Sequence, residues 1–395
     1  MMKLVFITEA RYVRVADGNV YSLESSFSYP LYQRYMNYFD EIIIVARVKS
    51  GMLSEVNAAN CVTKGNVTVI DLPYYVGFNG YLKNRRSLKH KIQTYLSQAI
   101  KSDMAVVCRV PGRVGTAAIS YLKTASIPYG IEVVGDPYDV LSKGATHHPL
   151  RPMLRMLSYY SLKRLCKKAP AALYVTRYKL QRRYPCPSFN IGVSDVIMPV
   201  EAFVEKCREG IKKSPVELIC VGTLEQAYKA PDVVIEALKI MSERGIDYHF
   251  TWVGDGVLRQ KMIDLCISYG IDKQCDFVGK LSSGGAVREK LDQADIFMMP
   301  SRMEGLPRAL VEAMARALPC VATNVCGIPE LLDPDMLIPV NDPEALVQKV
   351  KVLIDKPEVA RRQSERNLKE AMNYCEEVLG PQRKRFYDYV KELYH

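Results

Sequence analysis

Short apolar runs rich in β-branched residues alternate with amphipathic helical segments along most of the chain, and this alternation limits the possible folds more than any other feature. Because parallel strands need a crossover connection, usually a helix, the pattern predicts an α/β protein with parallel sheets that are wound on both faces. The predicted strands lie at residues 3–8, 41–48, 66–73, 105–110, 129–135 and 171–176, and then at 216–222, 248–254, 275–279, 294–300 and 319–323.

The length of 395 residues suits two domains of roughly 150–200 residues each. An irregular stretch near residues 188–214 predicts the boundary. We therefore expect an N-terminal domain at 1–200, a C-terminal domain at 201–375, and a C-terminal helix at 376–395 that packs back toward the N-terminal domain. Doubly wound sheets bind ligands at the carboxyl ends of their strands, which predicts a site in the cleft between two facing domains.

Composition excludes several classes of protein. The chain is 48% hydrophobic, so it is globular, and it has no apolar run of 18 residues. Its start, MMKLVFITEARYV, meets acidic and basic residues too early for a signal peptide, which predicts a cytosolic protein. The eleven cysteines are scattered without a C-x-x-C pair, so the sequence predicts reduced thiols and no metal site.

The charge differs between the two halves. Residues 1–200 hold 27 Lys and Arg against 12 Asp and Glu, whereas residues 201–395 hold 27 against 31. This asymmetry predicts an anionic partner for the first half, and no nucleic-acid-binding motif accompanies the charge. The pattern of residues 151–169 favours a core-facing helix with a basic outer face, and the alternative is a helix that lies on an anionic membrane. The basic residues of this segment are Arg151, Arg155, Lys163, Arg164, Lys167 and Lys168.

Two acids stand out in the apolar segment SRMEGLPRALVEAMARALPCVAT at residues 301–323. Glu304 follows a predicted strand, and Pro307 is placed to open a helix that contains Glu312, roughly 7.5 Å further along the axis. At such different depths the acids suit hydroxyls on two parts of an extended ligand, and they do not suit a glycosidase-type carboxyl pair. The free amides around Leu306, Arg308 and Ala309 would hold an anion. Alternatively, one glutamate is a helix-start acid and the other a surface acid.

The segment EGLPRALVEAMARALPCVAT, followed by CGIPELL, resembles the Glu-x7-Glu signature of the retaining family-4 glycosyltransferases, of the bacterial surface-polysaccharide type. These enzymes have the GT-B fold of two facing Rossmann-like domains. The resemblance extends over most of residues 216–350 and includes VGTLEQAYKAPDVVIEAL and the glycine turns WVGDG, FVGKL and CGIPE. The first half resembles the family only in its strand–helix rhythm, as expected for an acceptor domain.

The resemblance implies roles for individual residues. Glu312 would bind the ribose, Glu304 with the backbone of Gly305 and Leu306 would bind the donor sugar, and Lys229 would bind the diphosphate. The remaining donor-binding positions would be Arg308, Ala309, Gly254, Gly279 and Lys280, the last two meeting the base through their backbone.

Two positions depart from the family pattern. Thr223 stands where the family often has an arginine that binds the diphosphate. The strand in YGIEVVGDPYD lacks a sugar-facing histidine, which leaves Glu132 or Asp136 as candidates. A turn built by Gly135, Asp136 and Pro137 is the alternative interpretation for that segment.

The function that follows from the resemblance is transfer of a sugar from a UDP- or GDP-linked donor, with retention, without a metal and without a further cofactor. The acceptor would be a lipid-linked or growing surface polysaccharide at the inner face of the plasma membrane. The alternatives are a nucleotide-sugar epimerase of the same fold, which would not need a basic acceptor face, and a non-catalytic sugar-nucleotide-binding subunit.

Overall fold

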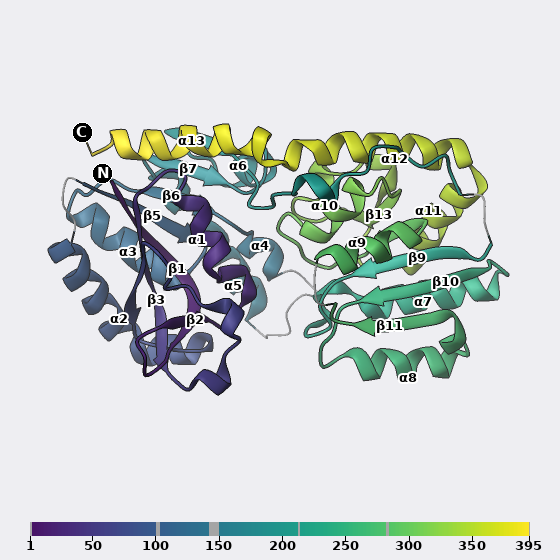
Figure 1. The fold of residues 1–395 in the computed structure, drawn as a ribbon, viewed down its shortest axis with the longest axis horizontal. Helices are drawn as coiled ribbons and strands as arrows, with labels where there is room; N and C mark the ends of the chain where they lie inside the picture. The colour runs from purple at the N-terminus through teal and green to yellow at the C-terminus, as the bar shows by residue number, and fades with distance from the viewer. Residues whose placement is uncertain (1, 100–102, 142–149, 212–213, 282–283, 395) are drawn as a thin grey trace. The chain divides into compact units, whose positions relative to one another are not determined.

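The computed structural model describes residues 2–99, 103–141, 150–211, 214–281 and 284–394 (Figure 1). The chain forms two compact units. Unit 1 consists of Met1–Gly135, Tyr159–Val193 and Pro381–His395, and unit 2 consists of Asp136–Ser158 and Ser194–Gly380.

The two units do not follow the single boundary at residue 200 that the sequence predicts. The chain passes between the units near residues 135, 158, 193 and 380, so each unit contains segments from both sides of the sequence boundary. The physical reason is that packing assigns a segment to the core that it contacts, and hydrophobic periodicity does not record which core that is.

Unit 1 is built on a sheet with the strand order β4-β3-β1-β5-β6-β7-β8, and β2 pairs antiparallel with β1. All other pairs in this sheet are parallel. Its strands are β1 (Lys3–Arg14), β2 (Val20–Ser22), β3 (Glu41–Ser50), β4 (Val67–Leu72), β5 (Met104–Val110), β6 (Gly130–Val133), β7 (Ala171–Tyr174) and β8 (Phe189–Gly192). Its helices are α1 (Tyr29–Tyr35), α2 (Gly77–Ala99), α3 (Arg113–Thr124) and α6 (Lys179–Arg183), with parts of α5 (Arg151–Lys167) and α13 (Glu376–Glu392).

Unit 2 is built on a fully parallel sheet with the order β11-β10-β9-β12-β13-β14. Its strands are β9 (Val216–Val221), β10 (Tyr248–Val253), β11 (Cys275–Gly279), β12 (Ile296–Met299), β13 (Cys320–Thr323) and β14 (Leu337–Ile338). Its helices are α4 (Pro137–Val140), α7 (Pro231–Glu243), α8 (Arg259–Tyr269), α9 (Gly284–Gln293), α10 (Arg308–Ala315), α11 (Pro343–Asp355) and α12 (Pro357–Ala371).

Hydrophobic cores cover both faces of the unit 2 sheet. Leu218 and Cys220 of β9 lie in one core with residues of α7 and α11, and Ile219 lies in the other with residues of α9 and α10. A parallel strand that is buried on both faces has apolar residues at every position, which is why these strands appear in the sequence as uninterrupted apolar runs. The doubly wound α/β architecture predicted from the alternation is therefore confirmed.

The end of α13 packs within unit 1. The Tyr387 hydroxyl donates a hydrogen bond to Oε1 of Glu132 at 2.8 Å, and the Tyr394 hydroxyl accepts one from the backbone amide of Val106 at 3.0 Å. Gly130 of β6 makes this approach possible, because a Cβ there would lie only 2.8 Å from Cγ2 of Val390. Residues at the two ends of the sequence thus share one core.

All eleven cysteines are free thiols, as the sequence predicts, and most of them are buried. Among the described residues, no helix combines the length and the apolar character that crossing a membrane would require.

Candidate functional site

The loop that carries Glu304 lies at the carboxyl edge of the unit 2 sheet. It leaves the buried strand β12 and enters α10, whose first residue is Arg308 and whose N-cap is Pro307. The loop is tied to its neighbour after β13, because the amide of Gly327 donates to the carbonyl of Gly305 at 2.9 Å. Gly305 is exposed, whereas the side chain of Leu306 belongs to the core, so only the backbone of Leu306 is available to a ligand. The first amides of α10, at Arg308 and Ala309, have no intrahelical acceptor and suit an anion.

Lys229 and Glu304 form an ion pair within unit 2. The Lys229 Nζ lies 2.6 Å from Oε1 of Glu304, and the two side chains are only 13% and 8% exposed. The stem of Lys229 crosses the backbone of Gly222, where a Cβ would lie 3.1 Å from the lysine Cδ and Cε. Since removing one partner of a buried pair typically costs about 3–5 kcal/mol, both charges are held at defined positions.

The residue after Lys229 is strained. Ala230 is fully buried and adopts a left-handed backbone conformation, with φ 52° and ψ 50°, at the point where Pro231 starts α7. A non-glycine residue in this region costs about 1–2 kcal/mol. Backbone strain of this kind concentrates at functional sites, because the surrounding structure imposes it to place a neighbouring group. The neighbouring group here is Lys229.

Glu312 presents the opposite case to Glu304. It lies in the middle of α10 between buried apolar residues, and its side chain makes no hydrogen bond or ion pair with any described residue. Burial raises the pKa of the Glu312 carboxyl above its ordinary value, and the positive charges of Arg308 and Arg288 offset only part of this effect. A desolvated carboxylate without a hydrogen-bond partner is typical of a ligand-binding group.

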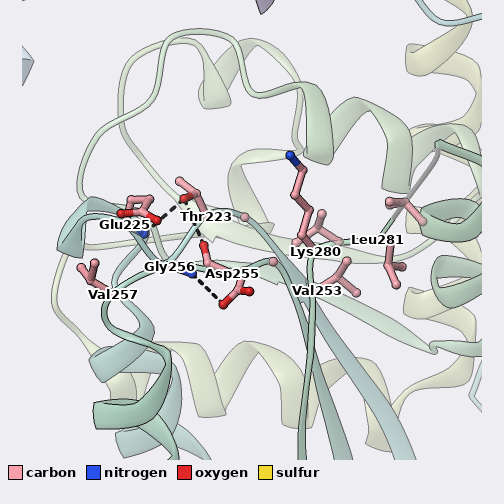
Figure 2. Close-up of a pocket in the computed structure, with 12 residues that line it drawn as sticks. Thr223, Glu225, Val253, Asp255, Gly256, Val257, Lys280 and Leu281 are labelled. Atoms are coloured by element: carbon pink, nitrogen blue, oxygen red, sulfur yellow. Dashed lines mark hydrogen bonds between the residues drawn. The ribbon is translucent and has the colours of Figure 1, made fainter. Parts of the chain in front are cut away.

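A cavity of about 780 Å³ opens at the ends of β9, β10 and β11 (Figure 2). This volume is within the usual range for a small-molecule site. Three of the residues singled out from the sequence, Thr223, Gly254 and Lys280, line it, and Gly279 contributes its carbonyl to the amide of Gly254 at 2.9 Å. Glu304 and Glu312 are not among the residues that line this cavity.

Two elements connect the cavity with the glutamates. Gly222, against which Lys229 packs, is part of the cavity wall. Helix α9 contributes Val287 to the same wall and, one residue later, Arg288, whose charge acts on Glu312. The cavity and the two glutamates are therefore linked through shared structural elements of unit 2.

Two glycines shape the cavity. Gly254 has φ 139°, and a Cβ there would lie 2.0 Å from the carbonyl oxygen of Gly222; Gly256 has φ 153°, and a Cβ there would lie 2.2 Å from the amide of Glu225. Any other residue at these positions would clash with backbone atoms, so the turn between β10 and α8 requires glycine at both.

Two acids that sequence reasoning missed also line the cavity. Glu225 and Asp255 are in its wall, and among the described lining residues Lys280 is the only basic side chain. Asp255 accepts the Gly256 amide at 2.9 Å through its Oδ1, and its carbonyl accepts the Thr223 hydroxyl at 3.3 Å (Figure 2). Thr223 therefore supports the turn and brings no positive charge. The aspartate between the glycines of WVGDG was the signal that could have identified Asp255.

Asp136 and Glu132 have structural partners. Asp136 is buried and caps α4 by accepting the Tyr138 amide at 3.0 Å, as expected of the turn interpretation. Glu132 is buried in unit 1, where it accepts hydrogen bonds from the hydroxyls of Tyr35 and Tyr387. Such partners favour a structural role for Glu132.

Asp139, three residues after Asp136, is linked to the Glu304 loop through Cys326. The thiol of Cys326 donates to Oδ2 of Asp139 at 3.2 Å, and burial raises the pKa of that thiol. The backbone of Glu304 also hydrogen-bonds to this thiol. Sequence reasoning missed both Asp139 and Cys326, because neither has a characteristic motif.

Among the described residues, no group of three or more His, Cys, Asp or Glu side chains is arranged to hold a metal ion. The Asp-x-Asp sequence at Asp333–Asp335, a pattern that can bind metals, is instead a helix cap in which Asp333 accepts the Asp335 amide at 3.0 Å.

The burial of Glu312 predicts a stability effect with a defined pH dependence. Replacing Glu312 with Gln should raise the free energy of unfolding, by an amount on the order of 1 kcal/mol, because the neutral amide costs less to bury than the carboxylate. The gain should be largest at neutral and alkaline pH. It should shrink as the pH falls through the raised pKa, since the wild-type carboxyl then becomes neutral as well.

Denaturant unfolding between pH 4 and 8 measures this difference. The exposed Glu236→Gln on α7 is the matched control, with little expected effect at any pH. A Glu312→Gln protein that is less stable than wild type at pH 8 would contradict the analysis of this site.

Comparison with known proteins places the site in a class. Residues 204–370 match the family model described as glycosyl transferases group 1. The chain is 29% identical over 374 residues to Protein CapJ of Staphylococcus aureus, covering 93% of this chain and 90% of that protein. It is 33% identical over 170 residues to the amylovoran biosynthesis glycosyltransferase AmsK of Erwinia amylovora, an alignment that covers 41% of each chain.

The fold is similar to that of solved glycosyltransferases. The lipopolysaccharide outer core galactosyltransferase WaaB, in its apo form, aligns over 99% of both chains with a TM-score of 0.67 and 13% identity. At that identity the likeness concerns the fold, which is the predicted GT-B architecture of two Rossmann-like α/β domains. The chain therefore has the GT-B fold, matches the glycosyl transferases group 1 model over residues 204–370, and is a glycosyltransferase.

Proposed function

We propose that the protein transfers a hexosyl group from a nucleoside-diphosphate sugar to a lipid-linked or growing surface polysaccharide, with retention of configuration and without a metal. The observation that carries the donor assignment is the contrast between two glutamates on one loop–helix segment. Glu304 is neutralised by Lys229, and Glu312 is half-buried without a hydrogen-bond partner among the described residues. The polysaccharide acceptor is proposed by similarity to AmsK, whose name refers to amylovoran biosynthesis.

Binding of the donor would give these charged side chains new partners. Its ribose hydroxyls would donate to Glu312, and its sugar hydroxyls would donate to Glu304. The ammonium group of Lys229 would then turn from Glu304 toward the diphosphate. Only the end of the side chain would move, because its stem packs against Gly222. The base would occupy the cavity near Lys280, since that end of the site has the required volume. The protein's own charged groups at this site, Lys229, Glu304 and Glu312, are already poorly solvated before the donor binds.

The transfer step needs stabilisation of the leaving group. As the bond between the anomeric carbon and the diphosphate oxygen breaks, its electron pair moves to the diphosphate. The ammonium of Lys229 and the first amides of α10 would stabilise that charge from fixed positions. The acceptor hydroxyl oxygen forms the new bond to the anomeric carbon, and its proton leaves with the diphosphate. Retention of configuration is taken from the family resemblance.

Membrane association is proposed from α5. Its residues Met153, Met156, Leu157 and Tyr160 are exposed and recur at helical spacing, so they form an apolar stripe that no described part of the chain covers. Arg164, Lys167 and Lys168 are exposed near the end of the same helix. This stripe supports the membrane interpretation over a core-facing helix for the first part of α5.

Two of the basic residues expected at the membrane have other partners. Arg151 donates to the carbonyl of Leu141 at 3.2 Å. Arg155 donates to the carbonyl of Tyr138 at 2.8 Å, and its guanidinium lies 3.6 Å from the centre of the Tyr138 ring. These arginines connect α5 with α4, so membrane attraction would come from the basic residues at the end of α5.

The donor assignment predicts different effects for the two glutamates. Glu312→Gln should weaken binding of free UDP or GDP roughly 10- to 100-fold, because a charge-assisted hydrogen bond to ribose is weakened. Glu304→Gln should leave that affinity equal or higher, because it releases Lys229 to the diphosphate, while transfer from the sugar nucleotide collapses. Calorimetry with UDP and GDP measures the affinities, and Glu236→Gln is the control. Equal nucleotide affinities of Glu312→Gln and wild type would refute the ribose assignment.

Metal independence predicts that activity survives chelation. Wild-type turnover should persist in EDTA, and Lys229→Gln should lower turnover about 10²- to 10³-fold without rescue by magnesium or manganese. Lys239→Gln on α7 is the control for loss of a lysine in unit 2. Loss of wild-type turnover in EDTA, with recovery on adding a divalent cation, would show that the diphosphate charge is neutralised by a metal.

The α5 stripe predicts binding to anionic vesicles that weakens as salt increases. Reversing Arg164, Lys167 and Lys168 to Glu should reduce binding at least about tenfold, since each basic residue near an anionic surface contributes about 1 kcal/mol. Replacing Met153 and Leu157 with Ser should reduce it as well. Reversal of three exposed basic residues in unit 2, Lys356, Arg362 and Lys369, is the control. Vesicle cosedimentation that is equal for all these variants would exclude α5 as the docking helix.

A further inference from the structure

We infer that unit 1 holds a binding pocket for the diphosphate of a lipid-linked acceptor, and that the apolar chain of this acceptor leaves the pocket over the start of α2. The inference rests on the proposed function and specifies the chemistry of the acceptor. The pocket is a cavity of about 350 Å³ at the carboxyl edge of the unit 1 sheet, and none of its described lining residues is assigned to the donor.

An irregularity in β1 forms one wall of the pocket. Between Ile7, which pairs with Val45, and Arg11, which pairs with Arg47, β1 contains two residues more than β3. The extra residues bulge out of the ladder, and Thr8, Glu9, Ala10 and Arg11 all line the cavity. The Thr8 side chain holds the bulge by accepting the amide of Ala10 at 3.3 Å. Bulges are frequent beside binding sites, because they redirect side chains that a regular strand would place in the sheet.

The wall behind the bulge is preassembled. Glu9 accepts the Tyr75 hydroxyl at 2.7 Å and the Val114 amide at 2.8 Å. Arg47 donates to the carbonyl of Tyr75 at 2.8 Å and lies 4.4 Å from the centre of the same ring. These contacts fix Glu9 and Arg47 in place before a ligand arrives. Binding therefore does not require the free energy of ordering these two side chains.

Arg11 and Arg109 give the pocket its affinity for an anion. Among the described residues that line the cavity, three are arginines and two are glutamates, and the wall uses one of each, Arg47 and Glu9. Arg11 forms a long ion pair with Glu24, its Nη2 lying 3.4 Å from Oε1, and among the contacts of Arg109 its guanidinium lies 5.3 Å from the centre of the Phe27 ring. A guanidinium presents paired N–H donors that match phosphate oxygens, so two arginines from neighbouring strands fit a diphosphate.

The rim of the pocket is apolar and exposed. Val76 lines the cavity and is 60% exposed, and Phe78 and Leu82, in the first turns of α2, are 55% and 42% exposed. Arg113 lies 5.6 Å from the centre of the Phe78 ring. Lys83, Arg85 and Arg86 follow on α2 and are exposed. A soluble sugar phosphate would need no apolar rim, whereas an amphiphile with an anionic head and an apolar chain matches both features.

Farnesyl diphosphate below its micelle concentration tests this inference, with inorganic diphosphate and farnesol as the two halves of the probe. Equilibrium binding to the full chain should be tightest for farnesyl diphosphate. Arg109→Gln and the more exposed Arg11→Gln should each weaken it roughly 10- to 100-fold and should weaken inorganic diphosphate too. The double variant Val76→Ser, Phe78→Ser should weaken farnesyl diphosphate and leave inorganic diphosphate unchanged. Lys64→Gln, an exposed lysine elsewhere in unit 1, is the matched control and should bind like wild type.

Three outcomes would overturn the inference. If Arg11→Gln and Arg109→Gln, shown to be folded by their melting curves, bind farnesyl diphosphate like wild type, the pocket is not its site. If inorganic diphosphate binds as tightly as farnesyl diphosphate, the ligand is a free phosphate compound and the lipid assignment fails. Lys229→Ala tests whether farnesyl diphosphate binds at the donor site instead of the unit 1 pocket. This variant should leave the farnesyl diphosphate affinity unchanged if the ligand binds in unit 1. Sugar-nucleotide turnover that persists without any farnesyl diphosphate binding would refute this inference alone and leave the proposed function intact.

Discussion

Parallel pairing of the strands is the constraint on which both sites depend. When every strand of a sheet runs in the same direction, all the connections that follow the strands meet at one edge, and side chains distant in the sequence become neighbours there. In unit 2 this edge joins the loop after β9, which carries Lys229, with the loop after β12, which carries Glu304. In unit 1 it joins the bulge of β1 with Arg109 of β5. The helices on both faces of each sheet supply the cores that keep these edges rigid.

The two glutamates of unit 2 illustrate two ways of keeping a carboxylate in a poorly solvated place. Glu304 is compensated by a lysine at 2.6 Å, and the pair lies beside the start of α10, where the first backbone amides have no intrahelical acceptor. Glu312 is compensated only in part, by the charges of Arg308 and Arg288, so the protein keeps it at a cost that a ligand with hydroxyl donors would reduce. The strained Ala230 adds to that cost. A chain that was selected only for stability would have no reason to keep these three features within one site.

In unit 1 the charged and the apolar groups occupy separate parts of one pocket. Its pocket combines guanidinium groups with a preassembled wall, and its rim exposes the first apolar residues of α2. The apolar stripe of α5, most of which belongs to unit 2, is a second exposed surface of the same kind. The positive balance of the first half of the sequence is therefore organised around apolar surfaces, which suits a partner that is both anionic and lipidic.

The sequence alone determined the local elements and identified the Glu304–Glu312 segment as the candidate donor-binding motif. The predicted strand at 275–279 coincides with β11, and the strands around the Glu304 segment lie where the apolar runs place them, because burial on both faces of a parallel sheet leaves a continuous pattern. Only the tertiary structure decided which groups meet. Lys229 and Glu304 are 75 positions apart and pair because β9 lies next to β12. Glu132 accepts a hydrogen bond from Tyr387, which lies 255 positions later in the chain. The bulge in β1 can be recognised only from its pairing with β3. Periodicity records how one element faces a core, whereas contacts between elements depend on strand order and register, which no local pattern contains.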